Sequence, residues 1–125
     1  MSQYDDNNVF ARIIAGDFPS QKVFEDDKVL AIKDIHPSAP VHVLVMPKLK
    51  FKSFDDFMAK AKPEDITYFF KKVREIAHKL KLEKNGYRLI MNHGSDAMQT
   101  VPHFHVHILG ERILGPLVVG DTYHR

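Results

Sequence analysis

Apolar residues recur at helical spacing in two stretches of the chain. The first stretch predicts a short helix from Val9 to Gly16, with Asn8 before it as a suitable N-cap. The second predicts a long helix from about Pro63 to Glu83, because its apolar residues form a single stripe. Pro63 suits the first helical position, and Asn85-Gly86 is typical of a helix stop. We therefore expect one short and one long helix.

Five shorter runs have the alternating or continuous apolar composition of β-strands. Charged residues 26–28 between two of these runs are typical of a hairpin turn, and the prolines in residues 36–40 predict a rigid loop. Alternate residues along each strand are expected on opposite faces of the sheet. The predicted strands are Lys22 to Glu25, Val29 to Asp34, Val41 to Met46, Tyr87 to Asn92, and His103 to Leu109.

These helices and strands are interleaved without a repeat or a linker, so they predict one α+β domain. We expect a five-stranded antiparallel sheet with one long and one short helix. The domain is expected over residues 8–118, with flexible termini at 1–7 and 119–125. Short strands leave an exposed sheet edge, so we also expect a homodimer in which two sheets join into one larger continuous sheet.

Composition removes several classes of function. The 18 basic and 16 acidic residues give a net charge of +2, so no bulk attraction to nucleic acid or to an anionic membrane is expected. The absence of cysteine excludes disulfides, thiolate zinc sites and a cysteine nucleophile. Residues 1–8 do not resemble a secretory signal, and no run approaches the roughly 20 apolar residues of a membrane span. A cytoplasmic protein is the expectation.

Three of the eight histidines fall at alternate positions, at His103, His105 and His107. On a strand these side chains would share one face, while the apolar residues between them would fill the core face. A single histidine on a strand is commonly structural, with one backbone hydrogen bond. Three polar side chains that each need a hydrogen-bond partner do not stabilise a buried face of a sheet. The row of histidines therefore indicates a catalytic or ligand-binding role.

Metal binding is one chemistry that uses a row of imidazoles. At about 3.3 Å per residue, however, His103 and His107 would lie about 13 Å apart at their backbones, so at most two of the three could bind one ion. Further ligands would have to come from His42 or a carboxylate, and no HExxH motif accompanies the row. We therefore expect neither a metal site nor a cofactor, although a metal protein stays an alternative.

Nucleophilic catalysis is the other chemistry. With an ordinary pKa near 6.5, an imidazole is largely neutral at pH 7, and one ring nitrogen can attack phosphorus if the other holds its hydrogen against a backbone carbonyl. Neighbouring histidines can then orient the attacking ring, stabilise charge on the phosphoryl oxygens or pass a proton to the leaving group. The central residue, His105, is the best candidate for the attack.

The run His103-Phe104-His105-Val106-His107-Ile108-Leu109 resembles the His-x-His-x-His-x-x motif, with x apolar, of the histidine triad family of nucleotide hydrolases and transferases. The similarity, to the nucleotide-binding branch of that family, covers roughly Asn8 to Leu114. It implies a HIT-like fold and a covalent nucleotidyl-histidine intermediate. It rests on Asn8 to Gly16, residues 24–27, Ala31 to Pro47 and Asn92 to Gly110.

The resemblance also implies roles for individual residues. His105 would be the nucleophile, His103 and His107 would support it, and His42 would be the fourth histidine of the site. Asp34 would accept hydrogen bonds from the ribose hydroxyls, although a turn-capping role is its alternative.

Two further groups of residues are implied by the same resemblance. Asn92, Gln99 and Thr100 fall where the family binds phosphate. An apolar pocket would hold the base, with Phe10 touching it, although its residues by composition alone are ordinary core residues. The pocket comprises Val9, Phe10, Ile13, Ile32, Ile35 and Leu44.

Two features depart from the family pattern. Ala97-Met98 stands where this branch usually has a pair of glycines, so side chains intrude where the backbone would approach a phosphate. Residues 115–125 lack the tryptophan-containing tail of the eukaryotic members. Both features leave the preference for a leaving group open.

The sequence favours hydrolysis of the P–N bond of a purine nucleoside 5′-monophosphoramidate, with an AMP-like or GMP-like mononucleotide as product. Cleavage of dinucleoside polyphosphates on the same scaffold is the nearest alternative. A purine nucleotide-binding module with incidental activity is another. The absence of a GxxxxGK[ST] loop argues against ATP hydrolysis of that type.

Overall fold

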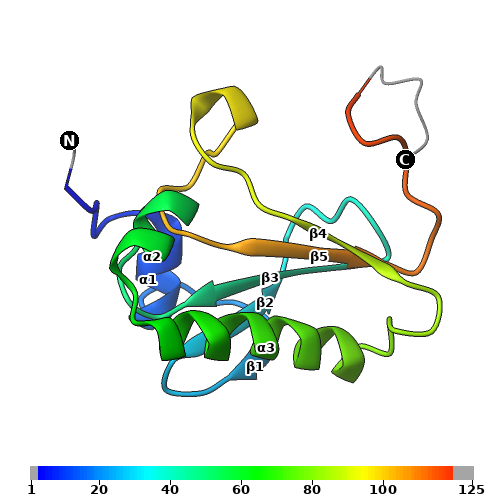
Figure 1. The fold of residues 1–125 in the computed structure, drawn as a ribbon, viewed down its shortest axis with the longest axis horizontal. Coiled ribbons are helices and arrows are strands. Elements are labelled where there is room, and N and C mark those ends of the chain that lie inside the picture. Colours follow the sequence, from blue (N-terminus) through cyan, green and yellow to red (C-terminus); the bar gives the residue numbers. More distant parts are fainter. Residues whose placement is uncertain (1–2, 120–125) are drawn as a thin grey trace.

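The computed structural model describes residues 3–119, which form an α+β fold (Figure 1). One antiparallel sheet of five strands carries helices on both of its faces, which confirms the predicted fold class. The elements in chain order are α1 (Val9–Ile14), β1 (Lys22–Glu25), β2 (Val29–Lys33), β3 (Val41–Pro47), α2 (Phe54–Lys60), α3 (Pro63–Lys79), β4 (Tyr87–Ile90), the 3-10 helix η1 (Ser95–Ala97) and β5 (Val106–Gly110).

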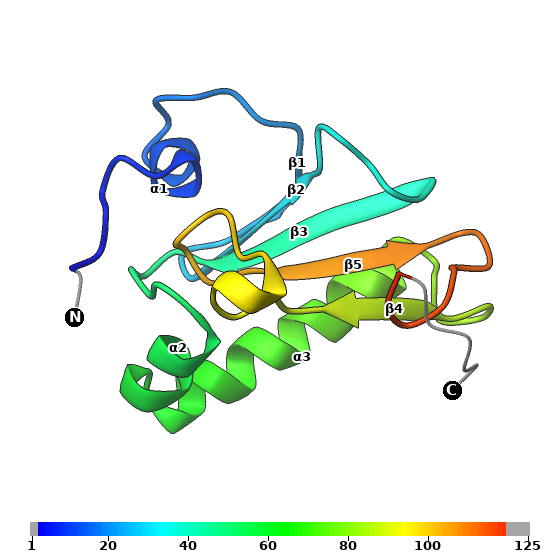
Figure 2. The ribbon, with the colours of Figure 1, turned by 90° about the horizontal axis from the view of Figure 1, so that it is seen from above.

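The strands lie in the order β1-β2-β3-β5-β4, so β3 is central and β1 and β4 form the edges. Figure 2 shows α1 on one side of the sheet, and α2 and α3 on the other. Strand β5, which carries His107 and follows directly after His105, pairs with β3 along one edge and with β4 along the other. Of the three clustered histidines, His107 is therefore the one whose backbone pairs with a strand on both sides.

Each face of the sheet has its own hydrophobic cluster. Val43 and Val45 of β3 pack with the buried residues beneath α2 and α3. Leu44 and Met46, which alternate with them, pack with Phe10 of α1. This alternation confirms the face assignment expected for the third strand, because successive side chains of a strand point in opposite directions.

Helix α2 is not among the expected elements. Its start is capped by Ser53, whose hydroxyl accepts from the backbone N–H of Asp56 at 3.2 Å, and two acidic residues in its first turn suit the helix dipole. The buried ring of Phe57 stacks on Phe104 with ring centroids 4.8 Å apart. The sequence signal was the Ser-x-x-Asp cap, but a seven-residue helix leaves too few turns for a periodic stripe.

Helix α3 begins at Pro63 as expected but ends at Lys79, four residues before the predicted end. The chain leaves the helix through Lys81, which has a left-handed φ of 61°. The backbone N–H of Lys81 donates to His78, and that of Leu82 donates to Ala77, which together form a Schellman cap. The reason for the early stop is packing, because the turn delivers Leu82 into the core.

The histidine strand is also shorter than expected, since β5 begins at Val106 and not at His103. Its partner β3 ends at Pro47, which has no N–H to extend the ladder. The backbone N–H of Phe104 instead donates to the carbonyl of Phe51 at 2.8 Å. Strands β2 and β4 also stop early, one and two residues before their expected ends.

No helix within residues 3–119 is both long and apolar enough to cross a membrane. Residues 1–2 and 120–125, parts of the expected flexible termini, lie outside the described residues. The expected domain boundaries at residues 8 and 118 stay a prediction.

Candidate active site

A cavity of about 370 Å³ opens on the α1 side of the sheet. Its walls come from α1, from the end of β2, from the loop that contains η1, and from the histidine segment. It brings together residues that the sequence places up to about 100 positions apart. Those that line it include His105, His107, Asp34, Asn92, Gln99, Thr100, Val9, Phe10, Ile13, Ile32, Ile35, Leu44, His36 and Met98.

His105 stands immediately before β5 and lines this cavity. Its Nδ1 lies 2.7 Å from the backbone oxygen of His103. A carbonyl oxygen can only accept, so the hydrogen of the neutral ring is on Nδ1. Within residues 3–119, nothing is hydrogen-bonded to Nε2 of His105, which leaves its lone pair available toward the cavity.

His103 does not line the cavity, because its side chain is fully buried behind His105. Its Nε2 lies 2.8 Å from the carbonyl oxygen of Pro47, and its Nδ1 lies 2.6 Å from the hydroxyl of Tyr4. Nε2 must donate to the carbonyl, so Nδ1 accepts from the tyrosine hydroxyl. His103 therefore supports the segment from below and does not contact a ligand in the cavity.

His42, on β3, reaches across to His107 on β5. Its Nδ1 accepts from the backbone N–H of Ser38 at 3.0 Å, so its hydrogen is on Nε2. That Nε2 lies 2.8 Å from Nδ1 of His107 and 3.3 Å from the carboxylate of Asp34. His107 thus accepts at Nδ1 and carries its own hydrogen on Nε2, where it can donate to a ligand.

All four rings favour the neutral form. Burial lowers the pKa of His103 to about 4. Burial, with the neighbouring His105 and His42, lowers the pKa of His107 to about 4 as well. Burial also holds the pKa of His105 and of His42 below the ordinary value, although Asp34 opposes this effect. The site therefore presents one lone pair, on His105, and one N–H, on His107, at neutral pH.

The expected base-pocket residues all line the cavity. The ring of Phe10 meets that of His105 edge to face, with centroids 4.8 Å apart, and this contact fixes one wall against the nucleophile candidate. Ile35, in contrast, is 85% exposed at the rim. Asp34 accepts from the backbone N–H of His36 at 2.8 Å, so one of its oxygens caps the turn, as the alternative interpretation of this residue expects. Its other oxygen faces His42, so the ribose-binding role stays a prediction.

The expected phosphate-binding residues lie on the opposite wall. Gln99 donates from its amide to the carbonyls of Lys52 and Val101, and accepts from the N–H of Gly94. Asn92 donates to the carbonyl of Ala97 at 2.8 Å. Both amides hold the loop in shape, and Gln99 has no further hydrogen for a phosphate. Thr100 is exposed at the cavity.

Met98 on this wall adopts a left-handed backbone conformation, with φ 59° and ψ 42°. A non-glycine residue there is strained, at a cost of about 1 kcal/mol or more. Its side chain is 78% exposed and lines the cavity. That this side chain intrudes on a bound phosphate stays a prediction.

Asp34, His42 and His107 form the one group among residues 3–119 whose ligand atoms lie close enough to hold a metal ion, within 4.8 Å of one another. The sequence had proposed ligands from the histidine row, but neither His103 nor His105 belongs to this group. An ion there would have to break the hydrogen bond between His42 and His107.

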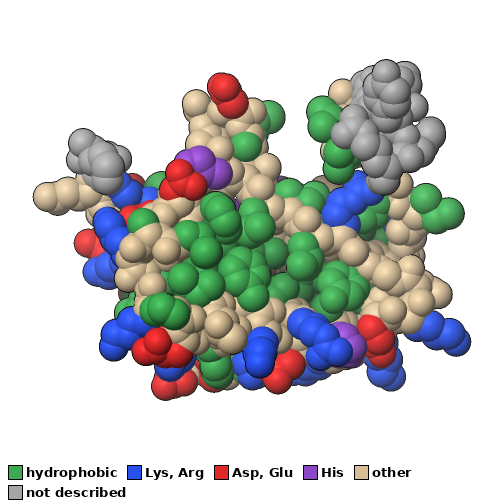
Figure 3. Space-filling view, viewed as in Figure 1, with side chains coloured by type: hydrophobic (Ala, Val, Ile, Leu, Met, Phe, Trp, Pro, Cys, Tyr) green, Lys and Arg blue, Asp and Glu red, His purple; other side chains and the backbone are tan. Residues whose placement is uncertain are grey.

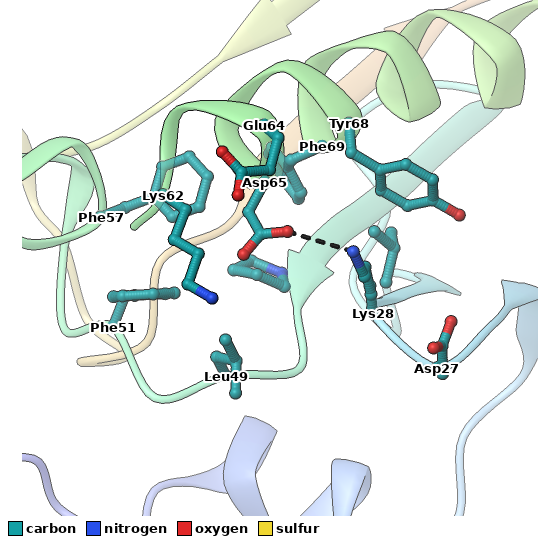
Figure 4. A pocket seen from close by; sticks show the side chains of 12 residues that line it. Asp27, Lys28, Leu49, Phe51, Phe57, Lys62, Glu64, Asp65, Tyr68 and Phe69 are labelled. Atoms are coloured by element: carbon teal, nitrogen blue, oxygen red, sulfur yellow. Dashed lines mark hydrogen bonds and ion pairs between the residues drawn. The ribbon is translucent and has the colours of Figure 1, made fainter. Parts of the chain in front are cut away.

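A second cavity of about 440 Å³ lies on the α3 side of the sheet (Figure 4). Phe51, Phe57 and Phe69 lie at its base, and an ion pair between Lys28 and Asp65 crosses its rim at 3.1 Å. It is lined by no histidine. The candidate active site is therefore assigned to the α1 side, where the clustered histidines converge.

Sequence reasoning missed two contributors to the site. Ser38 fixes the tautomer of His42 through its backbone N–H, which no side-chain pattern reveals. Tyr4 contacts His103, and the only signal was an aromatic residue within a polar segment. His93, which had no expected role, lies outside the cavity near Asp55.

The fold and the histidine cluster together define a class, an α+β protein that presents neutral imidazoles to a cavity on a five-stranded antiparallel sheet. The sequence profile of the HIT domain matches residues 15–114. The chain belongs to the HIT domain family.

Individual relatives support this assignment. The chain is 46% identical over 115 residues to an uncharacterized 13.2 kDa HIT-like protein of Azospirillum brasilense, across 92% of this chain and 94% of that protein. It is 35% identical over 113 residues to the purine nucleoside phosphoramidase of Escherichia coli K12, across 90% and 94%. The solved structure of a histidine triad protein from Clostridium difficile matches with a TM-score of 0.82 and 38% identity, across 93% of this chain and 100% of that one.

Proposed function

We propose that this chain hydrolyses purine nucleoside 5′-monophosphoramidates through a covalent nucleotidyl-histidine at His105. The observation that carries the proposal is the hydrogen bond from Nδ1 of His105 to the carbonyl of His103, which leaves Nε2 as a neutral nucleophile at the cavity. The similarity to the phosphoramidase of Escherichia coli supports the choice of substrate class.

The reaction has two displacements at phosphorus. Nε2 of His105 attacks the α-phosphorus, the P–N bond to the amine breaks, and the amine leaves with a proton. The N–H of His107 is the available donor for that proton or for the phosphoryl oxygens. Water then attacks the phosphorus, the bond to His105 breaks, and the mononucleotide is released. The proton that the water loses replaces the one taken up by the amine, so that His107 ends with its hydrogen on Nε2.

The size and walls of the cavity favour a mononucleotide over a larger substrate. A volume of about 370 Å³ lies in the range of small-molecule sites, and its apolar α1 wall suits one base. A dinucleoside polyphosphate would leave its second nucleoside outside. We place the purine against Phe10 and the α-phosphate beside His105, with the cytoplasm as the expected location of the protein.

The test is mass spectrometry of the native chain quenched after mixing with adenosine 5′-monophosphoramidate. A nucleotide adduct that is absent from His105→Asn supports the proposal. His93→Asn is the matched control, since it removes an exposed histidine outside the cavity. No adduct and no turnover, with nucleotide affinity equal in the native chain and His105→Asn, would contradict it and favour a binding module.

We also propose that two copies pair through β4. This strand is an edge of the sheet, and Leu89 on it is 45% exposed, with Met91 beyond it 42% exposed. Figure 3 shows hydrophobic side chains gathered over the region of β4 and α3. Antiparallel pairing of two β4 strands would cover these side chains and satisfy the free backbone groups of the edge.

Sedimentation velocity tests the pairing. The native chain is expected at twice the monomer mass, and Leu89→Arg at the monomer mass. Leu49→Arg, another exposed leucine but beside the second cavity, is expected to stay dimeric. A monomeric native chain, or a dimer that Leu89→Arg leaves intact, would contradict pairing through β4.

A further inference from the structure

The segment before α1 contributes a hydroxyl to the core of the histidine cluster. Tyr4 is 99 positions away from His103 in the sequence, yet its hydroxyl lies 2.6 Å from Nδ1 of that ring. The two rings meet edge to face, with centroids 5.7 Å apart. This contact is separate from the cavity, because neither residue lines it.

Within residues 3–119, this hydroxyl is the one donor that reaches Nδ1 of His103. The ring is fully buried, so water cannot replace it without opening the structure. An Nδ1 left without a donor would be a buried unsatisfied group. The hydroxyl therefore holds the ring in the tautomer whose Nε2 donates to Pro47 at 2.8 Å.

Tyr4 is itself held in place from several sides. Asn8, the cap of α1, donates from its side chain to the carbonyl of Asp5 at 2.7 Å, which closes the turn after Tyr4. Lys50 lies over the tyrosine ring at 6.0 Å and forms an ion pair with Asp6 at 2.6 Å. Burial raises the pKa of Tyr4, so its hydroxyl keeps its hydrogen at neutral pH.

The ring and the carbonyl of His103 act on different partners. The ring is held between Tyr4 and Pro47, and the carbonyl accepts from Nδ1 of His105 at 2.7 Å. His103 lies outside β5, so its carbonyl is not held by a strand ladder. The planar peptide unit that carries this carbonyl ends in the N–H of Phe104, which donates to Phe51 at 2.8 Å. The anchored ring of His103 holds the residue on the other side of this peptide unit, so the carbonyl is set by the ring and the Phe51 contact together.

We propose that Tyr4 is a positioning residue for the nucleophile, and that its hydroxyl, through the ring of His103, helps to hold the carbonyl that orients His105. The proposal rests on the proposed function of His105. It gives the N-terminal segment a part in the reaction, although that segment touches neither the cavity nor the substrate.

The test compares Tyr4→Phe with Tyr68→Phe. Each variant removes one tyrosine hydroxyl that makes a hydrogen bond to a residue distant in the sequence. The hydroxyl of Tyr68 donates to Asp26, away from the histidines. Tyr4→Phe is expected to lower kcat about tenfold with KM within about twofold, because binding groups are untouched. Tyr68→Phe is expected to leave both constants within about twofold of the native values.

A ring nitrogen spectrum supplies a readout that does not depend on turnover. With ¹⁵N-labelled histidine, the native chain is expected to show His103 as a single Nε2–H tautomer, and Tyr4→Phe to show a shifted or mixed one. Tyr4→Leu, which removes the ring as well, is expected to lower kcat at least as far.

Two results would overturn the proposal. One is an unchanged tautomer and an unchanged kcat in Tyr4→Phe. The other is a normal Tyr4→Phe beside an impaired Tyr4→Leu, which would mean that the ring packs and the hydroxyl does nothing. Failure of the proposed function looks different, since the native chain would then form no adduct at His105 while the tautomer of His103 still responded to Tyr4→Phe.

Discussion

The side chain of His105 donates to the backbone carbonyl of His103, two residues before it, at 2.7 Å. This bond places the hydrogen of His105 on Nδ1 and its lone pair on Nε2. A second pair, His42 with His107, places the hydrogen of His107 on the other ring nitrogen, because His107 accepts at Nδ1 and keeps its hydrogen on Nε2. One ring of the cavity can therefore attack while its neighbour donates.

His107→Ala is expected to lower kcat about 100-fold to 1,000-fold, as loss of a preorganised donor does. His42→Ala is expected to cost about tenfold, because His42 acts through His107 and does not line the cavity. Rapid quench of adduct formation and decay measures both effects. A larger loss in His42→Ala than in His107→Ala would contradict this division of roles.

Stability is expected to fall as the pH drops from about 6.5 to about 4. The pKa values of His103 and His107 are about 4 in the folded chain, below the ordinary 6.5 of the unfolded chain. Between these values the unfolded chain binds more protons, so acid favours unfolding there. The contribution of His103 alone is on the order of 3 kcal/mol, present above pH 6.5 and lost near pH 4.

Urea titrations at half-unit pH intervals measure this dependence as the free energy of unfolding. His107→Asn is expected to flatten the slope between pH 4 and 6.5, whereas His93→Asn, at an exposed position, is expected to leave it unchanged. A native profile that is level from pH 7 to pH 4.5 would rule out the neutral, buried state of these rings.

Chelation is expected to leave turnover within about twofold of the native value, because the attacking Nε2 of His105 is no part of the group Asp34, His42 and His107. Added Zn²⁺ is expected to inhibit, since an ion held there would take the ring that donates to the substrate. Assays after dialysis against a chelator, with and without Zn²⁺, decide this. Activity lost on chelation and restored by the ion would favour a metal enzyme instead.

Met98 is expected to influence which amine leaves. Its exposed side chain stands on the wall opposite α1, so it can cover an apolar leaving group. Met98→Gly is expected to lower kcat/KM about fivefold to tenfold for an aromatic phosphoramidate and to leave the unsubstituted one unchanged.

Met98→Asn serves as the control for the Met98 backbone, because asparagine also tolerates the left-handed conformation but lacks the apolar side chain. It is expected to behave as Met98→Gly does. Equal effects on the two substrates in both variants would show that the loop, and not the side chain, had changed.

Local pattern alone predicted much of this molecule. Alternation assigned Leu44 and Val45 to opposite clusters, and helical spacing found α1 and the start of α3. It also singled out the row of three histidines. These features are encoded within a few neighbouring residues, because side-chain direction follows the period of the backbone.

Only the tertiary structure decided how the histidines divide their work. The sequence could not tell that Pro47, on another strand, stops the ladder before His103 or that its carbonyl accepts from that ring. Nor could it bring Tyr4 to the same ring or His42 to His107, which are 65 positions apart. Hydrogen-bond direction depends on which partners meet in space, and contacts between distant segments leave no period in the sequence.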